Sequence, residues 1–292
     1  MNAAIYPWND RAGRFSGLKA AVLLACIVPM ALLAAKALGG MLGSKPLTYA
    51  IHDTGDWAVR FLLISLFVTP LRTIANWPKL IIVRRMLGLT ALAYVLVHLS
   101  LYIAEQRYDL VKVASEIILR FYLTIGFVAL LGLVVLGITS TDGMIKRLGS
   151  ARWNRLHNAV YALTALALAH FFIQSKLDVT QAVLMSGFFI WLMAYRGLRK
   201  RGLTVAALSL TAVAAGSALI TALVEAAWYA GMTGVAASRV LEANLDFSFT
   251  IRPAWWVLAA GVVLAGVHAL RGARTTQRER GNQPLTAEAV TR

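Results

Sequence analysis

The sequence contains very little cysteine and very little charge. Among its 292 residues there is one cysteine, Cys26, and only 14% of the residues are charged. A single cysteine excludes an internal disulfide, a covalently attached c-type haem, a thiolate zinc site and an iron–sulfur cluster. Acidic residues are scarcer than basic ones, 13 against 29, so the formal net charge is +16. These shortages leave a basic, mostly apolar chain in which few side chains can carry chemistry.

Long apolar runs are the main feature that the sequence does contain. Hydrophobic residues make up 59% of the chain and the mean hydropathy is +0.68. Several runs approach the roughly 20 apolar residues that cross a hydrocarbon core of about 30 Å. We therefore predict an all-α, polytopic membrane helical bundle. The predicted spans are residues 20–38, 57–74, 86–104, 121–138, 156–173, 182–195, 203–229 and 254–270.

The distribution of basic residues predicts how the chain is oriented. In a soluble protein a charge of +16 would suggest a nucleic-acid partner. Here the basic residues cluster in short loops between apolar runs, which is typical of topology signals and of contacts with anionic lipid. Most Lys and Arg residues fall on the side that carries the N-terminus. The positive-inside rule makes that side the cytoplasm, so we predict a bacterial inner-membrane protein with both termini cytoplasmic, membrane lipid as a partner and no nucleic acid.

The first apolar run allows a second interpretation. A basic start followed by an apolar stretch that ends in AAKA is also compatible with a signal peptide. Pro29 in the middle of the run and the many later spans favour a retained first helix.

Two of the five histidines lie deep inside predicted spans. A histidine within a membrane-length apolar run is costly and needs a partner or a function. His98 lies about 12 residues into its span and His170 about 14 into its own, so at about 1.5 Å per residue both are about 18–21 Å from the cytoplasmic end. Two neutral imidazoles at one depth on neighbouring helices can give six-coordinate haem iron, which transfers electrons rather than binding gas. The alternative is a polar contact between helices.

His157 lies near the cytoplasmic end of the same span as His170. A second haem at this depth would need a partner about 14 residues before His98, and that position is Arg84, which stays protonated and cannot ligate iron. On a straight helix His157 also points about 140° away from the face of His170. Its role therefore stays open between a second, less regular haem, an alternative ligand and a hydrogen bond to another cofactor.

Four arginines surround this position in the sequence. Guanidinium groups suit haem propionates or a flavin phosphate, although solvated positive-inside charge explains each arginine equally well. These residues are Arg84, Arg85, Arg152 and Arg155.

The remaining polar residues within apolar runs allow less specific predictions. Tyr94, His98 and Tyr102 recur every four residues on one helix face, which could line a cofactor slot or simply pack as aromatics. His52, in a predicted loop, and His268, near the end of the last span, are predicted to be non-ligands. Glu225 is predicted to be an interfacial residue rather than a proton relay.

Two segments carry a resemblance to a known family. The runs RRMLGLTALAYVLVHLSLY (84–102) and ITSTDGMIKRLGSARWNRLHNAVYALTALALAHFF (138–172) resemble the MsrQ family. That family comprises the haem-binding membrane subunits of the protein-methionine-sulfoxide reductase system and belongs to the ferric-reductase-like transmembrane group. The similarity covers about residues 18–198, with further support from FLLISLFVTPLR (61–72).

The resemblance implies a domain organisation. A six-helix, ferric-reductase-like, haem-binding core would occupy residues 18–198, after a cytoplasmic N-terminal segment at 1–17. Residues 199–270 would form a C-terminal extension of two transmembrane helices that the resemblance does not explain. Residues 271–292 would form a disordered cytoplasmic tail, since they are polar.

The resemblance also implies a function. It implies b-type haem, one or two per chain, bound through His98, His157 and His170, together with an association with FMN. Electrons would pass from the quinone pool to a periplasmic molybdenum-containing methionine sulfoxide reductase (MsrP-like) that repairs oxidised envelope proteins. The chain would then be an electron-transfer subunit of an oxidoreductase system, with no substrate-reducing site of its own evident.

Two other functions remain as alternatives. Related ferric reductases carry a flavin and nicotinamide domain after the membrane core, whereas here no GxGxxG motif follows a strand-like run. We therefore expect the electrons to come from a lipid-soluble donor or a separate protein. A stand-alone ferric or cupric reductase is the first alternative. A transporter is the second, and the lack of an internal repeat and of broken half-helices argues against it.

Overall fold

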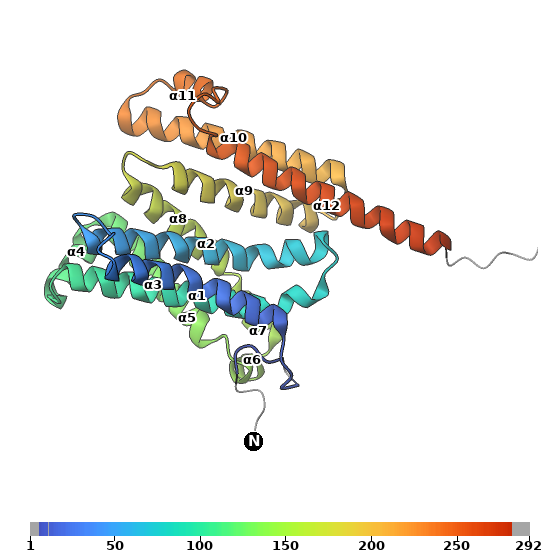
Figure 1. Ribbon diagram of the computed structural model, residues 1–292, viewed down its shortest axis with the longest axis horizontal. Coiled ribbons are helices and arrows are strands. Elements are labelled where there is room, and N and C mark those ends of the chain that lie inside the picture. The colour runs from blue at the N-terminus through green and yellow to red at the C-terminus, as the bar shows by residue number, and fades with distance from the viewer. Residues whose placement is uncertain (1–5, 11, 282–292) are drawn as a thin grey trace, which may run out of the picture. The chain divides into compact units, whose positions relative to one another are not determined.

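The computed structural model describes the backbone of residues 6–10 and 12–281, and the side chains of these residues up to residue 271. Within this part of the chain the regular secondary structure consists of helices joined by turns and loops, with one isolated β-bridge between Asn9 and Phe15. The helices (Figure 1) are α1 (Gly17–Leu38), α2 (Pro46–Ile74), the 3-10 helix η1 (Pro78–Val83), α3 (Arg84–Glu105), α4 (Leu110–Leu119), α5 (Phe121–Ile138), α6 (Asp142–Leu148), α7 (Ser150–His157), α8 (Val160–Ser175), α9 (Thr180–Lys200), α10 (Ala207–Thr233), α11 (Ala237–Ala243) and α12 (Pro253–Gly281).

Seven helical segments among the described residues are long and apolar enough to cross a membrane. They are α1, α2, η1 with α3, α5, α7 with α8, α10 and the part of α12 up to Arg271. This confirms the prediction of an all-α, multi-pass membrane bundle. Helix α9 was also predicted to cross and has 21 residues, but Gln181 and Arg196 near its ends lower its hydropathy. Both termini lie on the same side of a membrane only if the number of crossings is even. The cytoplasmic position of both termini therefore depends on α9 as an eighth crossing and stays a prediction.

Besides the short helices η1, α6 and α11 in predicted loops, three differences between the predicted and observed helices concern the long segments. Helix α2 begins at Pro46, so residues 46–56 are helical rather than a loop. Proline at the first helical position loses nothing by lacking an N–H, since that group has no partner there. The span predicted at 156–173 is two helices, because the chain turns at Asn158 and Ala159 between α7 and α8.

The third difference is at the C-terminus. Helix α12 continues to Gly281, whereas the sequence predicted a disordered tail from residue 271. The rest of that tail, residues 282–292, lies outside the described residues.

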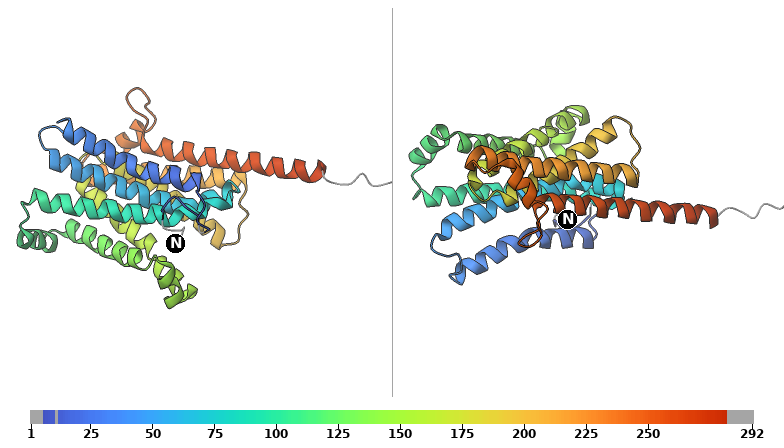
Figure 2. Two further views of the ribbon diagram at one scale, coloured as in Figure 1. Left: turned by 60° about the horizontal axis from the view of Figure 1, so that its bottom comes forward. Right: turned by 90° about the horizontal axis from the view of Figure 1, so that it is seen from above.

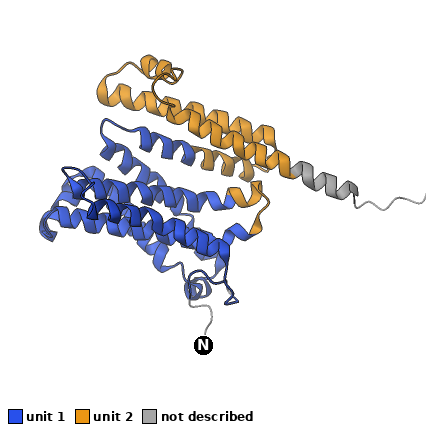
Figure 3. Ribbon diagram, in the orientation of Figure 1, with its two compact units in different colours: residues 1–69, 79–189 blue, residues 70–78, 190–292 orange. Residues whose placement is uncertain are grey.

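The chain divides into two compact units (Figure 3). Unit 1 comprises residues 1–69 and 79–189, and unit 2 comprises residues 70–78 and 190–292. In unit 1, α3 packs against α1 and α5, and α5 packs against α4 and α8. Within unit 2, α10 packs along α12 and contacts α11 (Figure 2).

Tyr94 on α3 ties α1 to the bundle of unit 1. Pro29 inside α1 lacks an N–H and crowds the preceding turn, so the backbone bonding around it is disturbed. The Tyr94 hydroxyl fills this gap: it donates to the Cys26 carbonyl at 2.9 Å and accepts from the Met30 N–H at 3.0 Å. Of the two roles predicted for Tyr94, the structure therefore shows the structural one, with its ring packed 5.1 Å from that of Phe61.

A glycine allows α5 and α8 to approach each other closely. A Cβ atom at Gly132 on α5 would lie 2.3 Å from the Leu163 Cδ2 atom on α8. Since real Cβ atoms do not tolerate such a contact, a larger residue at position 132 would displace the Leu163 side chain. The contact matters for the site because α8 carries His170.

Unit 2 contains an ion pair whose carboxylate is buried. Glu225 on α10 is fully buried within the protein, and its predicted position near the membrane interface stays a prediction. Its two carboxylate oxygens accept hydrogen bonds of 3.1 Å from Arg252 Nη1 and from Asn244 Nδ2. Trp255 Nε1 donates to the Asn244 carbonyl at 2.6 Å. This network fixes the connection between α10 and α12, since a buried carboxylate needs both charge and hydrogen-bond partners.

Candidate functional site

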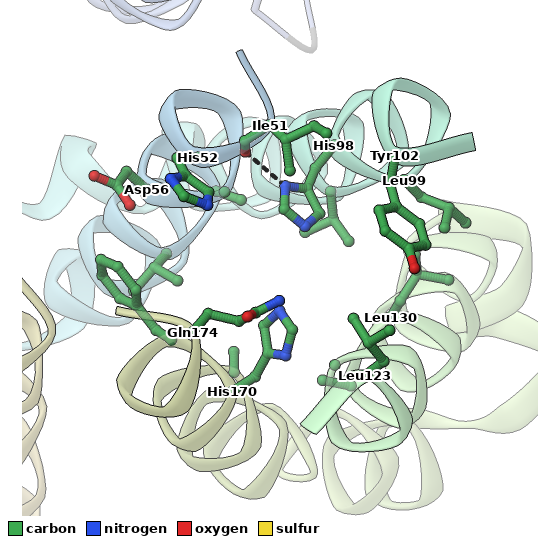
Figure 4. Close-up of a pocket in the computed structure, with 18 of the residues that line it drawn as sticks. Ile51, His52, Asp56, His98, Leu99, Tyr102, Leu123, Leu130, His170 and Gln174 are labelled. Atoms are coloured by element: carbon green, nitrogen blue, oxygen red, sulfur yellow. Dashed lines mark hydrogen bonds between the residues drawn. The ribbon is translucent and has the colours of Figure 1, made fainter. Parts of the chain in front are cut away.

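Helices α2, α3, α5 and α8 of unit 1 surround a cavity of about 500 Å³ (Figure 4). Its walls are mainly apolar, with Val95, Leu99, Leu123, Leu130 and Leu133 among the lining residues. Polar side chains also line it, including Thr48, His52, Asp56, Glu105 and Gln174. Cavities of this size, apolar with a few polar groups, are typical of sites for small molecules and cofactors.

His98 and His170 point into this cavity from facing helices. The centroids of their imidazole rings are 6.5 Å apart and the ring planes are at 87° (Figure 4). The side chains come from α3 and α8, the two predicted spans that were expected to bring them level. The geometric prediction that these two histidines meet is therefore correct.

The Nδ1 atom of each ring is held by a backbone carbonyl of a different helix. His98 Nδ1 lies 2.8 Å from the Ile51 carbonyl oxygen on α2. His170 Nδ1 lies 2.8 Å from the Tyr122 carbonyl oxygen on α5. A carbonyl oxygen only accepts, so each neutral ring must carry its proton on Nδ1 and keep a lone pair on Nε2. This is the tautomer that a metal ligand requires.

The spacing of the two rings fits a metal-bound group between them. Two metal–imidazole bonds of about 2 Å, plus about 1 Å from each ligating nitrogen to its ring centre, would separate the centroids by roughly 6 Å. The observed separation of 6.5 Å agrees with this. Both rings are also fixed through Nδ1, as ligating histidines usually are. The residues present therefore fit a haem, which His98 and His170 could hold through their Nε2 atoms.

Several polar residues that line the cavity have ion-pair or hydrogen-bond partners. Arg60 lies 3.6 Å from Asp56 and donates to Gln181 at 3.1 Å. Thr48 donates to Glu105 at 2.7 Å. His52, predicted to be a loop residue and a non-ligand, is on α2 and lines the cavity beside Asp56 (Figure 4). Polar groups here can position the charged edge of a cofactor while the apolar walls cover its body.

His157 lies outside this cavity. It ends α7, its ring is stacked on Trp153 with centroids 3.9 Å apart, and its Nε2 atom lies 3.0 Å from the Thr139 hydroxyl. The described residues include no cluster of three or more His, Cys, Asp or Glu residues suited to hold a metal ion. The structure thus separates His157 from the other two predicted ligands and gives it hydrogen-bonding and stacking partners.

The four predicted arginines are divided between two helices near His157. Arg84 and Arg85 are the first two residues of α3, and their positive charges repel a protonated His157 ring. Arg85 is also paired with Asp142 at 2.6 Å. Arg152 and Arg155 are exposed on α7. None of the four lines the cavity of His98 and His170.

Several features of the cavity were missed at the level of sequence. The carbonyls of Ile51 and Tyr122 carry no signal in a side-chain pattern. Gly55 and Gly126 also line the cavity and were not singled out. His52 and Asp56 could have been found from their spacing of four residues, which places both on one helix face, had residues 46–56 been assigned to a helix.

Comparison with known proteins agrees with this geometry. The family model described as "Ferric reductase like transmembrane component" matches residues 54–168. That range includes His98 and His157 and ends two residues before His170. No solved structure matches the chain.

The similar relatives carry one shared name, "Protein-methionine-sulfoxide reductase heme-binding subunit MsrQ". The protein of Rhodospirillum rubrum is 39% identical over 189 residues, which are 64% of this chain and 88% of that protein. The protein of Caulobacter vibrioides is 36% identical over 176 residues, covering 60% and 84%. The protein of Xanthomonas campestris (strain 8004) is 42% identical over 156 residues, covering 53% and 71%.

Proposed function

We propose a function from one established premise: this chain belongs to the MsrQ family of haem-binding subunits of protein-methionine-sulfoxide reductases. We infer that it is the membrane electron-transfer subunit of such a system. It would bind b-type haem and pass electrons from the quinone pool to a periplasmic, molybdenum-containing methionine sulfoxide reductase. The repair of oxidised methionine in envelope proteins would be the outcome.

One observation carries this proposal: two imidazoles from α3 and α8 face each other at 6.5 Å inside an apolar cavity. The family name alone does not say which residues bind haem. The 6.5 Å spacing of the His98 and His170 rings and the carbonyl contacts of their Nδ1 atoms support this pair as the ligands. We therefore assign the haem ligands to His98 and His170.

The residues around this pair have separate roles. The Ile51 and Tyr122 carbonyls orient the rings through Nδ1 and strengthen the electron donation of Nε2. The leucine and valine walls exclude water, which lowers the local dielectric around the bound group. A haem with two histidine ligands supplies one-electron transfer and has no open position for dioxygen. His52 and Asp56 supply the polar edge of the cavity.

The region around His157 is proposed to serve a different group. The positive charges of Arg84, Arg85, Arg152 and Arg155 suit a phosphate or carboxylate. FMN, which the family resemblance implies, is the proposed ligand of this region, with the Trp153–His157 stack as a flat aromatic surface beside it. A second haem is less well supported there because the Nε2 atom of His157 already contacts Thr139.

The proposed location is the bacterial inner membrane, with both termini in the cytoplasm. The positive-inside distribution of Lys and Arg supports this orientation. It places the His98–His170 pair in the periplasmic half of the bilayer, close to a periplasmic partner.

Reconstitution tests the proposal as a whole. The purified full-length protein in liposomes, supplied with a reduced quinone, should support reduction of methionine sulfoxide only when a periplasmic methionine sulfoxide reductase of this system is added. Omission of this chain should abolish turnover. Equal turnover with and without this chain would contradict the proposal.

The same preparation separates the alternatives. Rapid reduction of chelated ferric or cupric ions without any partner protein would instead identify a stand-alone metal reductase. A colourless protein that contains no haem and moves a solute across the liposome would identify a transporter.

A further inference from the structure

The two carbonyls that hold the histidines share a sequence relationship within their helices. The Ile51 carbonyl on α2 is followed four residues later by Gly55. The Tyr122 carbonyl on α5 is followed four residues later by Gly126. Two helices that are distant in the sequence thus present the same arrangement, a carbonyl acceptor at position i and a glycine at position i+4.

Helix geometry explains why position i+4 matters. In an α-helix the carbonyl of residue i points toward residue i+4 and accepts its N–H. Every Cα–Cβ bond tilts toward the helix N-terminus, so the side chain at i+4 covers the turn that contains this carbonyl. A carbonyl oxygen has two lone pairs and can accept a second hydrogen bond only if it remains accessible. Glycine at i+4 leaves it accessible from the side.

The histidine rings occupy the space that glycine leaves free. A Cβ atom at Gly126 would lie 2.8 Å from Nδ1 and 2.9 Å from Cε1 of His170. A Cβ atom at Gly55 would lie 3.1 Å from Nδ1 and 3.2 Å from Cε1 of His98. The first contact forces the ring or the helix to move, and the second requires a displacement of a few tenths of an ångström. A methyl group at either position would therefore push the ring away from its carbonyl.

We propose that Gly55 and Gly126 are positioning residues that open one helix carbonyl each to the Nδ1–H of His98 and His170, and so fix the tautomer and orientation in which the two Nε2 atoms can ligate one haem iron. The inference rests on the proposed function, because it concerns haem ligation by this pair. It adds two residues and a mechanism that the family membership does not supply. Glycine is otherwise unfavourable within a helix, so replacement by alanine should favour α2 and α5 unless the site needs the space.

Four single substitutions in the full-length protein test this inference. Gly126→Ala and Gly55→Ala place a methyl group against the two rings. Gly88→Ala is the neutral control, since it lies on α3 with His98 and a Cβ atom there has nothing within 4 Å. Gly137→Ala is the packing control, since it lies on α5 with Gly126 and its Cβ would lie 2.4 Å from Leu92 Cδ2, not from a histidine.

The measurements are haem content per chain, the visible and paramagnetic-resonance spectra of the low-spin centre, and its midpoint potential. Gly126→Ala should weaken haem retention by about 10- to 100-fold, the range observed when an outer-shell partner of a metal ligand is lost. In the haem that remains, the low-spin signal should decrease and the potential should become more positive, because an imidazole without its Nδ1–H bond is a weaker donor to the oxidised metal. Gly55→Ala should show the same changes to a smaller extent, and Gly88→Ala none.

Two results would overturn the inference. One is a Gly126→Ala protein with wild-type haem content, spectra and potential. The other is a Gly137→Ala protein whose spectra and potential change as much as those of Gly126→Ala, because general helix packing would then explain both. If Gly126→Ala does not fold, the comparison of Gly55→Ala with Gly88→Ala decides by the same measurements.

The outcome is distinguishable from failure of the proposed function. If His98→Ala and His170→Ala keep full haem, the ligand assignment itself is wrong. If these histidine variants lose haem while both glycine variants behave as the wild type, the ligands stand and only the role of the glycines is refuted.

Discussion

The imidazole rings of His98 and His170 face each other with their centroids 6.5 Å apart. The Nδ1 atom of each ring lies 2.8 Å from a backbone carbonyl oxygen on another helix. Four helices therefore contribute to one pair of side chains, two by carrying the rings and two by orienting them. The site depends on the packing of α2 and α5 as much as on the histidines. Variants at residues that do not line the cavity should therefore separate effects on stability from effects on the cofactor.

Tyr94→Phe should destabilise unit 1 while leaving the cavity intact. The change removes the hydroxyl that serves both the Cys26 carbonyl and the Met30 N–H beside Pro29. Loss of hydrogen-bond partners for buried groups costs about 1–3 kcal/mol. The measurement is chemical or thermal unfolding of the purified protein in detergent. Tyr108→Phe, at an exposed position, is the control, and equal stability of the two variants would show that the Tyr94 hydroxyl is unimportant.

Arg252→Met should destabilise unit 2 without affecting haem. Its guanidinium is the cationic partner of Glu225, whose side chain is fully buried. Removing one partner of a buried ion pair costs roughly 3 kcal/mol, and the partial exposure of Arg252 makes that an upper value here. Arg239→Met on α11, an exposed position, removes the same charge from the same connection and should have little effect. Identical unfolding curves for the two variants would contradict the structural role of the pair.

His157→Ala should leave the haem of the His98–His170 pair in place. The ring contacts Thr139 and Trp153 rather than the cavity, so its loss should not change haem content per chain. Haem quantification together with the difference spectrum checks this. A fall in haem content in this variant alone would point to a second haem, or to His157 as an alternative ligand.

The sequence predicted those parts of the fold that depend on regular apolar runs. Helix α5 was predicted at its observed bounds because Arg120 and the polar residues after Ile138 limit it on both sides. The meeting of His98 and His170 was predicted from equal depth in two spans, which requires only the rise per residue and the direction of crossing. Both results follow from chain geometry that a membrane constrains strongly.

Features that depend on backbone atoms or on local breaks were not predicted. Residues 46–56 were assigned to a loop because of their glycine, aspartate and proline residues, although Pro46 is favourable at a helix start. The turn at Asn158 between α7 and α8 had no clear breaker residue to mark it. Gly55 and Gly126 were missed because glycine is common in membrane helices, and its role emerges only when a ring from another helix occupies the free space.

The most direct test of the account is the haem content of His98→Ala and His170→Ala, each measured beside His268→Ala on α12, which is predicted to be a non-ligand. Haem per chain and the reduced-minus-oxidised spectrum of the purified proteins should show a low-spin b-type centre in the wild type and in His268→Ala, and loss of most of that signal in the other two. Full retention of the low-spin signal in either His98→Ala or His170→Ala would contradict ligation by this pair.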